Sequence, residues 1–434
     1  MLEESVKKLI EKNKWPMRDS FINSQVKSFV FDLQKVIAEL SKQDKKDLVF
    51  ELMDMFSFNL SIRLYIIHEI SKKPARLTSD FGGFQLRADS DCLLLLKETR
   101  WVLIAKHHGN IKTKILRKVS PKKNKPARML GIYGLKDLVL QKMLVLLIEP
   151  YYESILHDEV FGFRQGRLQM HAVADLTFLV TQGQRGKTVI LLNIQKCFDQ
   201  ILTSKLKQIR VPSKFRKITD NWLQDDIFKC GSKEFIVSSE RGVSQGSTIG
   251  PLFTNIILNN LKSAAFSDFP KKLNRDKNLG KTNVSNHCLT YAGDVVIIFN
   301  VGKLSSILSN IANFLNSLGL EINKEKTKVI RLSKKKLHFD YLGFRFLYVP
   351  IKKLRLGSLV QQHSNLHAKK GSNEPGKMLM TVSPASLTSI KDKLKSIIRS
   401  SYNFSVPQLI DKLNPIIRRF GDYFNWGHSY RVLS

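Results

Sequence analysis

Apolar side chains recur at intervals of three and four along the first eighty residues. Val26, Val30 and Leu33 are one such set. This period puts apolar side chains on one face of a helix, so we expect residues 1–80 to be helical. A glycine-containing break at 81–92 follows.

The middle of the chain mixes strand-like and helix-like runs. A β-branched, apolar run at 188–193 predicts a buried strand, and 288–299 predicts two short strands around a tight turn. Helical periodicity returns at 135–156, 250–261 and 305–318. Further strand-like segments lie at 117–134, 225–243 and 337–349.

The C-terminal part of the chain changes character twice. Residues 351–380 are rich in Lys, Gly and Ser, which predicts a linker or flexible loop. Residues 384–430 show a helical period again. We detect no internal repeat.

Positive charge is strongly unequal along the chain. Residues 1–100 carry 17 basic and 15 acidic side chains, whereas 101–434 carry 54 and 22, and the net charge is +34. A folded surface this basic favours a polyanion, and we expect nucleic acid. No apolar run approaches the ~18 residues of a membrane span, so we expect no membrane partner. Four cysteines without CxxC spacing argue against a disulfide scaffold or zinc site.

Eight sequence blocks follow one another in a recognisable order. They are RKVSPKKNKPARMLGIYG (117–134), FGFRQGR (161–167), LLNIQKCFDQI (191–201), RGVSQGSTIGPLFTNIILNNL (241–261), LTYAGDVVIIF (289–299), GLEINKEKTKVIRL (319–332), FDYLGFRF (339–346) and LIDKLNPIIRRFGDYFNWGHS (409–429). Each block alone is a weak signal, but the shared order and spacing make a specific one.

These blocks resemble those of group II intron-encoded reverse transcriptases and maturases. The resemblance implies an α+β fold with a right-hand polymerase-like arrangement. It assigns 1–105 to a helical N-terminal extension, 106–350 to fingers and palm, 351–383 to a linker or flexible loop, and 384–434 to the thumb and maturase domain X. No DNA-binding or endonuclease extension is expected after domain X.

The polymerase chemistry of that family depends on carboxylates that hold two Mg²⁺ ions. The resemblance places them at positions 193, 293 and 294, but this chain has Asn193, Gly293 and Asp294 there. A neutral amide and a glycine are poor replacements for metal ligands. We considered Asp199, which the family uses for backbone structure, and expect no restored site from Asp225 or Asp226 in a loop-like stretch. We therefore expect no active catalytic residue, no metal site and no cofactor in the protein, with Mg²⁺ accompanying the RNA.

Basic clusters are the expected RNA-binding surface, because Lys and Arg neutralise phosphates while nearby aromatic rings can stack on unpaired bases. The resemblance adds the Gln-Gly turn that shapes the template cleft. The candidate residues are Arg117, Lys118, Lys122, Lys123, Arg128, Arg164, Arg167, Gln245, Lys352, Lys353, Arg418 and Arg419.

The resemblance implies a splicing cofactor rather than an enzyme. The chain would bind a group II intron RNA, or its precursor transcript, and promote its folding and splicing, with no small-molecule substrate. Two alternatives stay open: an active RNA-directed DNA polymerase with an atypical metal site, and a basic structural RNA-binding protein. The sequence opens without a targeting signal and is rich in Lys over Arg. We expect an organelle-encoded protein, in a plastid rather than a mitochondrion.

Overall fold

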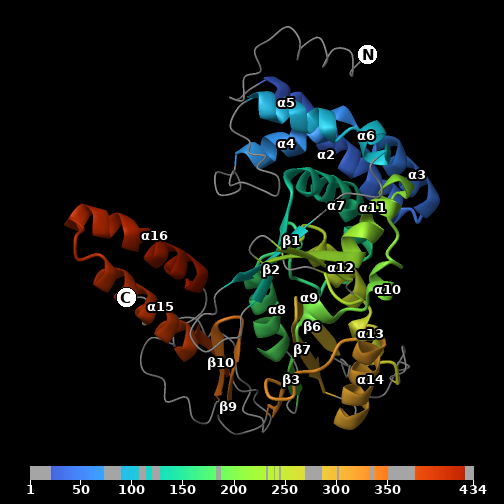
Figure 1. The fold of residues 1–434 in the computed structure, drawn as a ribbon. Helices are drawn as coiled ribbons and strands as arrows, with labels where there is room; N and C mark the ends of the chain where they lie inside the picture. The colour runs from blue at the N-terminus through green and yellow to red at the C-terminus, as the bar shows by residue number, and fades with distance from the viewer. Residues whose placement is uncertain are drawn as a thin grey trace. The chain divides into compact units, whose positions relative to one another are not determined.

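The computed structural model describes residues 21–72, 89–106, 114–119, 128–181, 187–230, 233–238, 240–243, 246–268, 286–300, 303–332, 337–349 and 377–425. These residues fall in two compact units. Figure 1 labels the helices and strands in chain order. Unit 1 is Met1–Arg164, Ile194–Leu261 and Ala312–Glu321, and unit 2 is Gln165–Asn193, Lys262–Ile311 and Ile322–Ser434. The expectations for 1–20 and 351–376 lie outside the described residues.

Unit 1 begins with a layer of helices. They are α2 (Phe21–Lys42), α3 (Lys46–Phe56), α4 (Leu60–Ser71), α5 (Asp89–Glu98), α6 (Trp101–Lys106) and α7 (Leu135–Ile155). Helix α7 is the centre of this layer, because α2, α3, α4 and α5 all contact it. Its residues Val139, Leu140, Met143 and Leu144 are fully buried. The helical prediction is confirmed for 21–72 and for 135–155, and α7 continues through Pro150.

Unit 1 also contains a four-stranded sheet in the order β2-β1-β4-β5. Its strands are β1 (Lys114–Val119), β2 (Arg128–Tyr133), β4 (Asp225–Cys230) and β5 (Lys233–Ser238). Strand β1 is antiparallel to β2 and parallel to β4. Asp225 and Asp226 therefore lie in a strand, not in the expected loop.

Four further helices complete unit 1, and a fifth follows them in the chain. They are α9 (Cys197–Gln200), α10 (Thr203–Leu206), α11 (Ser213–Gln224) and α12 (Gly250–Leu258), followed by α13 (Leu261–Ala265).

Unit 2 is organised around an antiparallel sheet in the order β6-β7-β3-β8. Its strands are β6 (His287–Tyr291), β7 (Asp294–Phe299), β3 (Thr188–Asn193) and β8 (Lys328–Arg331). Val295 to Phe299 of β7 are all buried, as an apolar run in a central strand should be. Helix α8 (Gln169–Thr181) contacts β6. The strands and turn predicted at 188–193 and 288–299 are confirmed. Helix α14 (Leu304–Ser317) ends before Gly319, as predicted.

A second sheet of unit 2 has the order β11-β10-β9 and precedes two C-terminal helices. The strands are β9 (Leu337–Tyr341), β10 (Phe344–Val349) and β11 (Lys377–Val382), and the helices are α15 (Pro384–Ser400) and α16 (Val406–Phe424). Strand β11 corrects the expected linker, because 377–382 pairs along the full length of β10. Its Met378, Met380 and Val382 alternate into the core, a short period-two signal at the end of a polar segment.

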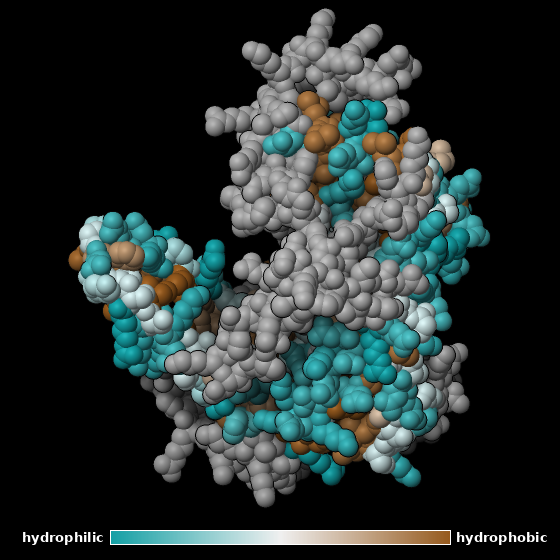
Figure 2. Space-filling view, in the orientation of Figure 1, coloured by the Kyte–Doolittle hydropathy of each residue, from teal (hydrophilic) through white to brown (hydrophobic). Residues whose placement is uncertain are grey.

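The architecture mixes helices and sheets and is α+β, as the resemblance implies. No described helix combines the length and apolar character that a membrane span requires. In Figure 2 the described surface in view is mostly hydrophilic, with apolar side chains in small groups.

Candidate nucleic-acid interface and remnant polymerase site

Two of the three remnant positions meet at the ends of the two central strands of the unit 2 sheet. Strands β3 and β7 are antiparallel, and their register places Asn193 opposite Asp294. The Asn193 Nδ2 atom donates a hydrogen bond of 2.6 Å to Asp294 Oδ1. The Asn193 carbonyl in turn accepts from the Asn323 backbone N–H at 2.8 Å. At these three positions the chain retains one carboxylate, and it accepts a hydrogen bond from a neutral amide.

The third position lies in the turn between β6 and β7. Tyr291 pairs with Asp294, so Ala292 and Gly293 form a two-residue hairpin turn. Ala292 has a φ of +54°, in the left-handed region, where a Cβ is strained. Gly293 contributes no side chain, so this hairpin presents a single carboxylate.

This arrangement does not fit a pair of Mg²⁺ ions. Such a pair requires several anionic oxygen ligands, and Asn193 directs its N–H, not its oxygen, at the Asp294 carboxylate. Within the described part of the chain, no group of three or more His, Cys, Asp or Glu side chains could hold a metal. The absence of metal chemistry in the whole protein stays a prediction.

Three tyrosines lie around this hairpin and the neighbouring β9–β10 turn. The Tyr341 hydroxyl is buried and has no hydrogen-bond partner among the described residues. Burial raises the pKa of Tyr341, and the charge of Asp294 raises it further. The Tyr423 hydroxyl donates to the Leu342 carbonyl at 2.8 Å, and burial raises its pKa to about 12, with Tyr291 contributing. The sequence pattern alone does not predict these tyrosine contacts.

The β9–β10 turn holds the two C-terminal helices. The Gly343 carbonyl accepts hydrogen bonds from the Ser383 backbone N–H at 2.9 Å and from Ser386 Oγ at 3.1 Å. Gly343 has a φ of +83°, and a Cβ there would lie 3.2 Å from Phe424 Cζ. Phe424 packs on Phe344 with the ring centroids 4.8 Å apart. The end of α16 and the start of α15 are therefore fixed on one turn.

Arg418 and Arg419 are exposed on α16. Residues 384–425 carry seven basic and three acidic side chains, so this helical pair has a positive surface. Ser405 begins α16 with a capping box, and its backbone N–H donates to Gln408 Oε1 at 3.0 Å. Arg167 is partly exposed on the segment that leads into α8.

Arg164 requires a correction. Its side chain is 3% exposed and forms a 2.5 Å ion pair with Glu153. Its Nη1 atom also donates to the His157 and Val160 carbonyls at 2.8 and 2.7 Å. With most of its donors used inside the protein, Arg164 stabilises its own loop and is not an RNA contact in this structure. Its positive charge predicts a surface position, but burial cannot be inferred from charge alone.

The remaining candidates are placed only in part. Strand β1 carries Arg117 and Lys118, and Arg128 begins β2 opposite Val119; their side chains are not described. The candidates outside the described residues are Lys122, Lys123, Gln245, Lys352 and Lys353.

The segment just after Gln245 reveals a positioning residue that the sequence did not suggest. Gln141 of α7 is fully buried. Its Oε1 atom accepts from the Thr248 backbone N–H at 2.8 Å and from Ser247 Oγ at 3.2 Å. Gln141 therefore fixes the backbone and side chain at Ser247 and Thr248.

Two family models match this chain. The reverse transcriptase (RNA-dependent DNA polymerase) family covers residues 120–346, which is more than half of the chain. The chain belongs to the reverse transcriptase family. The maturase-specific domain of group II introns matches residues 387–434, which include α16 and nearly all of α15. The predicted resemblance is therefore confirmed, and family membership implies a polymerase-like fold.

Curated relatives share part of this chain. Protein YkfC of Escherichia coli is 29% identical over 255 residues, which are 52% of this chain and 65% of YkfC. The putative COX1/OXI3 intron 1 protein of Saccharomyces cerevisiae is 23% identical, over 57% of this chain and 34% of its own length. A 91 kDa protein in the cob intron of Schizosaccharomyces pombe is 25% identical, over 70% and 42%. The chain thus spans less than two thirds of each relative.

Proposed function

We propose that this protein is a group II intron maturase that binds intron RNA and promotes its folding and splicing without synthesising DNA. The observation that carries the proposal is the Asn193–Asp294 hydrogen bond at the centre of a reverse transcriptase domain that is followed by a maturase-specific domain. The intron RNA would perform the transesterification, and the protein would supply charge and shape.

The hydrogen bond between Asn193 and Asp294 supports loss of polymerase activity. Removing one well-placed electrostatic group can cost about 10²–10³ in rate, and here two of the three metal-ligand positions are neutral. We assign the β6-β7-β3-β8 sheet to the palm and helices α15 and α16 to the thumb and domain X, within the limits 106–350 and 384–434.

The proposed RNA-binding surface is basic, and its residues come from several elements. It includes the β1–β2 residues Arg117, Lys118 and Arg128, and the α16 residues Arg418 and Arg419. Neutralising 6–10 phosphates makes affinity fall by about 10³–10⁵ between 50 and 200 mM salt. The proposed partner is an intron or its precursor transcript.

Crosslinking in vivo followed by sequencing of the bound RNA tests this function. We expect a group II intron to be enriched, and we expect that intron to splice faster at low Mg²⁺ when purified protein is added. A pull-down dominated by ribosomal RNA would instead support a basic structural RNA-binding protein and overturn the proposal.

An active RNA-directed DNA polymerase is the second candidate, because the reverse transcriptase family model covers the palm residues. Nucleotide incorporation on an RNA template would favour it. The geometry of Asn193 and Asp294 argues against it.

We also propose residence in an organelle, because two relatives are named as proteins of the COX1/OXI3 and cob introns. The relatives do not support the expected preference for a plastid over a mitochondrion.

A further inference from the structure

Phe163 is an exposed aromatic residue in a backbone conformation that phenylalanine rarely adopts. Its φ is +59°, in the left-handed region, where a residue with a Cβ is strained. Its surface is 54% exposed, so burial does not compensate for the strain. The backbone strain and the exposure of an apolar ring both cost stability, which points to a function for the Phe163 ring.

The backbone on both sides of Phe163 is fixed. Asn255 Nδ2 donates to the Gly162 carbonyl at 2.6 Å, and the next residue, Arg164, is buried in its ion pair with Glu153. The loop therefore cannot relax the strain at Phe163. The ring projects from a rigid support, which lowers the entropy lost when a ligand stacks on it.

Phe163 does not stand alone, because Phe198 lies beside it. The two ring centroids are 5.8 Å apart and the rings are nearly perpendicular, at 79°. The Phe198 carbonyl accepts from the Val243 backbone N–H at 2.7 Å, so the backbone that carries the second ring is held as well. In an edge-on pair, the ring that presents its edge keeps its faces uncovered by its partner.

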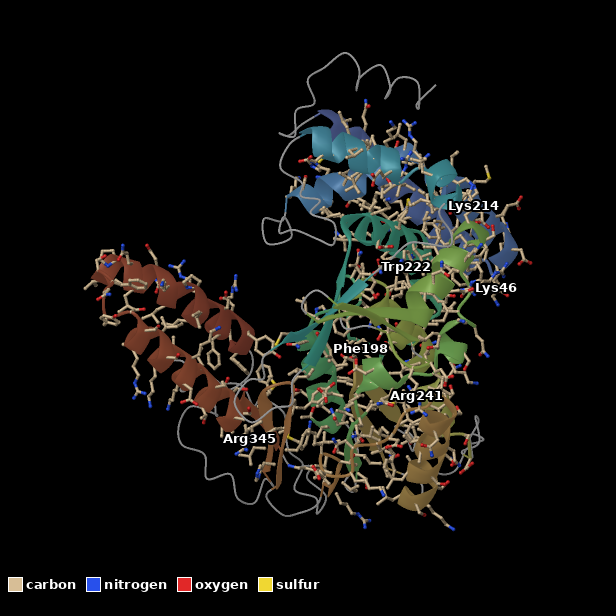
Figure 3. The ribbon with its side chains drawn as sticks, viewed as in Figure 1. Lys46, Phe198, Lys214, Trp222, Arg241 and Arg345 are labelled. Carbon is tan, nitrogen blue, oxygen red and sulfur yellow. The ribbon has the colours of Figure 1, made fainter. Side chains whose placement is uncertain are left out.

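Two exposed cationic residues of the same unit lie close to Phe198. Lys196 lies two residues before Phe198 in the chain. Arg241 donates from Nη1 to Gln200 Oε1 at 3.3 Å, and Gln200 lies two residues after Phe198. Figure 3 labels Phe198 and Arg241. Rings with cations beside them match the chemistry of a nucleotide, a flat base with an anionic phosphate.

We propose that Phe163 and Phe198 form a stacking platform for an unpaired base of RNA, with Lys196 and Arg241 contacting its neighbouring phosphates. This inference rests on the proposed function, since it assumes that the protein binds RNA. An unpaired base is required because the faces of bases inside a duplex are already stacked on one another.

The Phe163→Gly variant distinguishes an effect on RNA affinity from an effect on folding stability. Glycine tolerates a positive φ, so the melting temperature of the variant should equal or exceed that of the wild type. Its affinity for a single-stranded RNA of mixed sequence should be about 10-fold weaker, measured by fluorescence anisotropy. Affinity for a blunt RNA duplex with the same number of phosphates should change less than ~2-fold, because phosphate contacts dominate it. Phe163→Trp should restore single-strand binding.

Phe178→Ala is the matched control, because Phe178 is 59% exposed on α8 and lies outside the platform. It should bind both RNAs as the wild type does. Wild-type affinity of Phe163→Gly for single-stranded RNA would overturn the platform alone, as would an equal loss for single strand and duplex. If the wild type binds neither RNA, the proposed function itself fails.

Discussion

Asn193 and Asp294 form a side-chain hydrogen bond of 2.6 Å between adjacent strands. In a polymerase site of this family, both positions would carry carboxylates held together by metal ions. Here the neutral amide of Asn193 donates a hydrogen bond to Asp294, so the sheet needs no cation to keep these two positions together.

Asn193→Asp tests this relationship. The substitution removes the donor and places two carboxylates within hydrogen-bonding distance of one another, and like charges so close are unfavourable. Because this pair is exposed, we expect a loss of about 1 kcal/mol or less in the free energy of unfolding at pH 7, measured by urea denaturation. The loss should shrink as the pH is lowered, since protonating one carboxyl group removes the repulsion. Asn193→Ala is the control, and it should lose less than Asn193→Asp. Equal losses, or none, would contradict the account.

Two tyrosines near the same hairpin provide a matched pair. The Tyr423 hydroxyl donates to the Leu342 carbonyl, whereas the Tyr341 hydroxyl is buried without a described partner. Tyr423→Phe should therefore cost about 1 kcal/mol in the free energy of unfolding, and Tyr341→Phe should be neutral or stabilising. Equilibrium denaturation of both variants decides this. The reverse order would show that the hydroxyl contacts are assigned wrongly.

The same phenols predict loss of stability in alkali. Burial raises the pKa of Tyr423 from 10.0 to about 12, and it raises that of Tyr341 as well. Above pH 10 the unfolded chain releases these protons while the folded chain keeps them. Stability is therefore retained below pH 10 and falls as the pH rises toward 12. The double variant with phenylalanine at both positions should show a shallower fall in melting temperature across this window. An unchanged slope would contradict the prediction.

Gly343 and Gly166 separate steric conflict from backbone strain. Both have a positive φ, +83° and +72°, but only a Cβ on Gly343 would meet neighbours, Ser386 Oγ at 3.1 Å and Phe424 Cζ at 3.2 Å. Alanine at either site should cost about 1–2 kcal/mol from the left-handed backbone. Gly343→Ala should lose more, because it also displaces the end of α16. Thermal denaturation of the two variants measures the difference, and equal melting temperatures would argue that Phe424 yields without cost.

The sequence indicated much of this fold because its strongest patterns are local. The continuous apolar run of β7 shows that this strand is buried, and the helical spacing of apolar residues in α7 shows that this helix is buried. Strand β11 was missed since its alternating residues occupy only 377–382 beside a polar segment. Its stability comes from pairing with β10, a contact that is distant in sequence.

The candidate site was predictable only as a set of residue types. The replacement of carboxylates at 193 and 293 is visible in the sequence, but the hydrogen bond from Asn193 to Asp294 depends on the register of two strands about a hundred residues apart. Burial of Arg164 and the strained exposure of Phe163 depend equally on tertiary contacts. Neither charge nor aromatic character reveals them.

The most direct test of the central claim is primer extension on an RNA template that the protein demonstrably binds, with Mg²⁺ or Mn²⁺ and all four deoxynucleotides. The account predicts stable RNA binding and no nucleotide incorporation above that of the Asp294→Asn variant. Incorporation that depends on Asp294 would show that a working metal site survives, and would contradict the account.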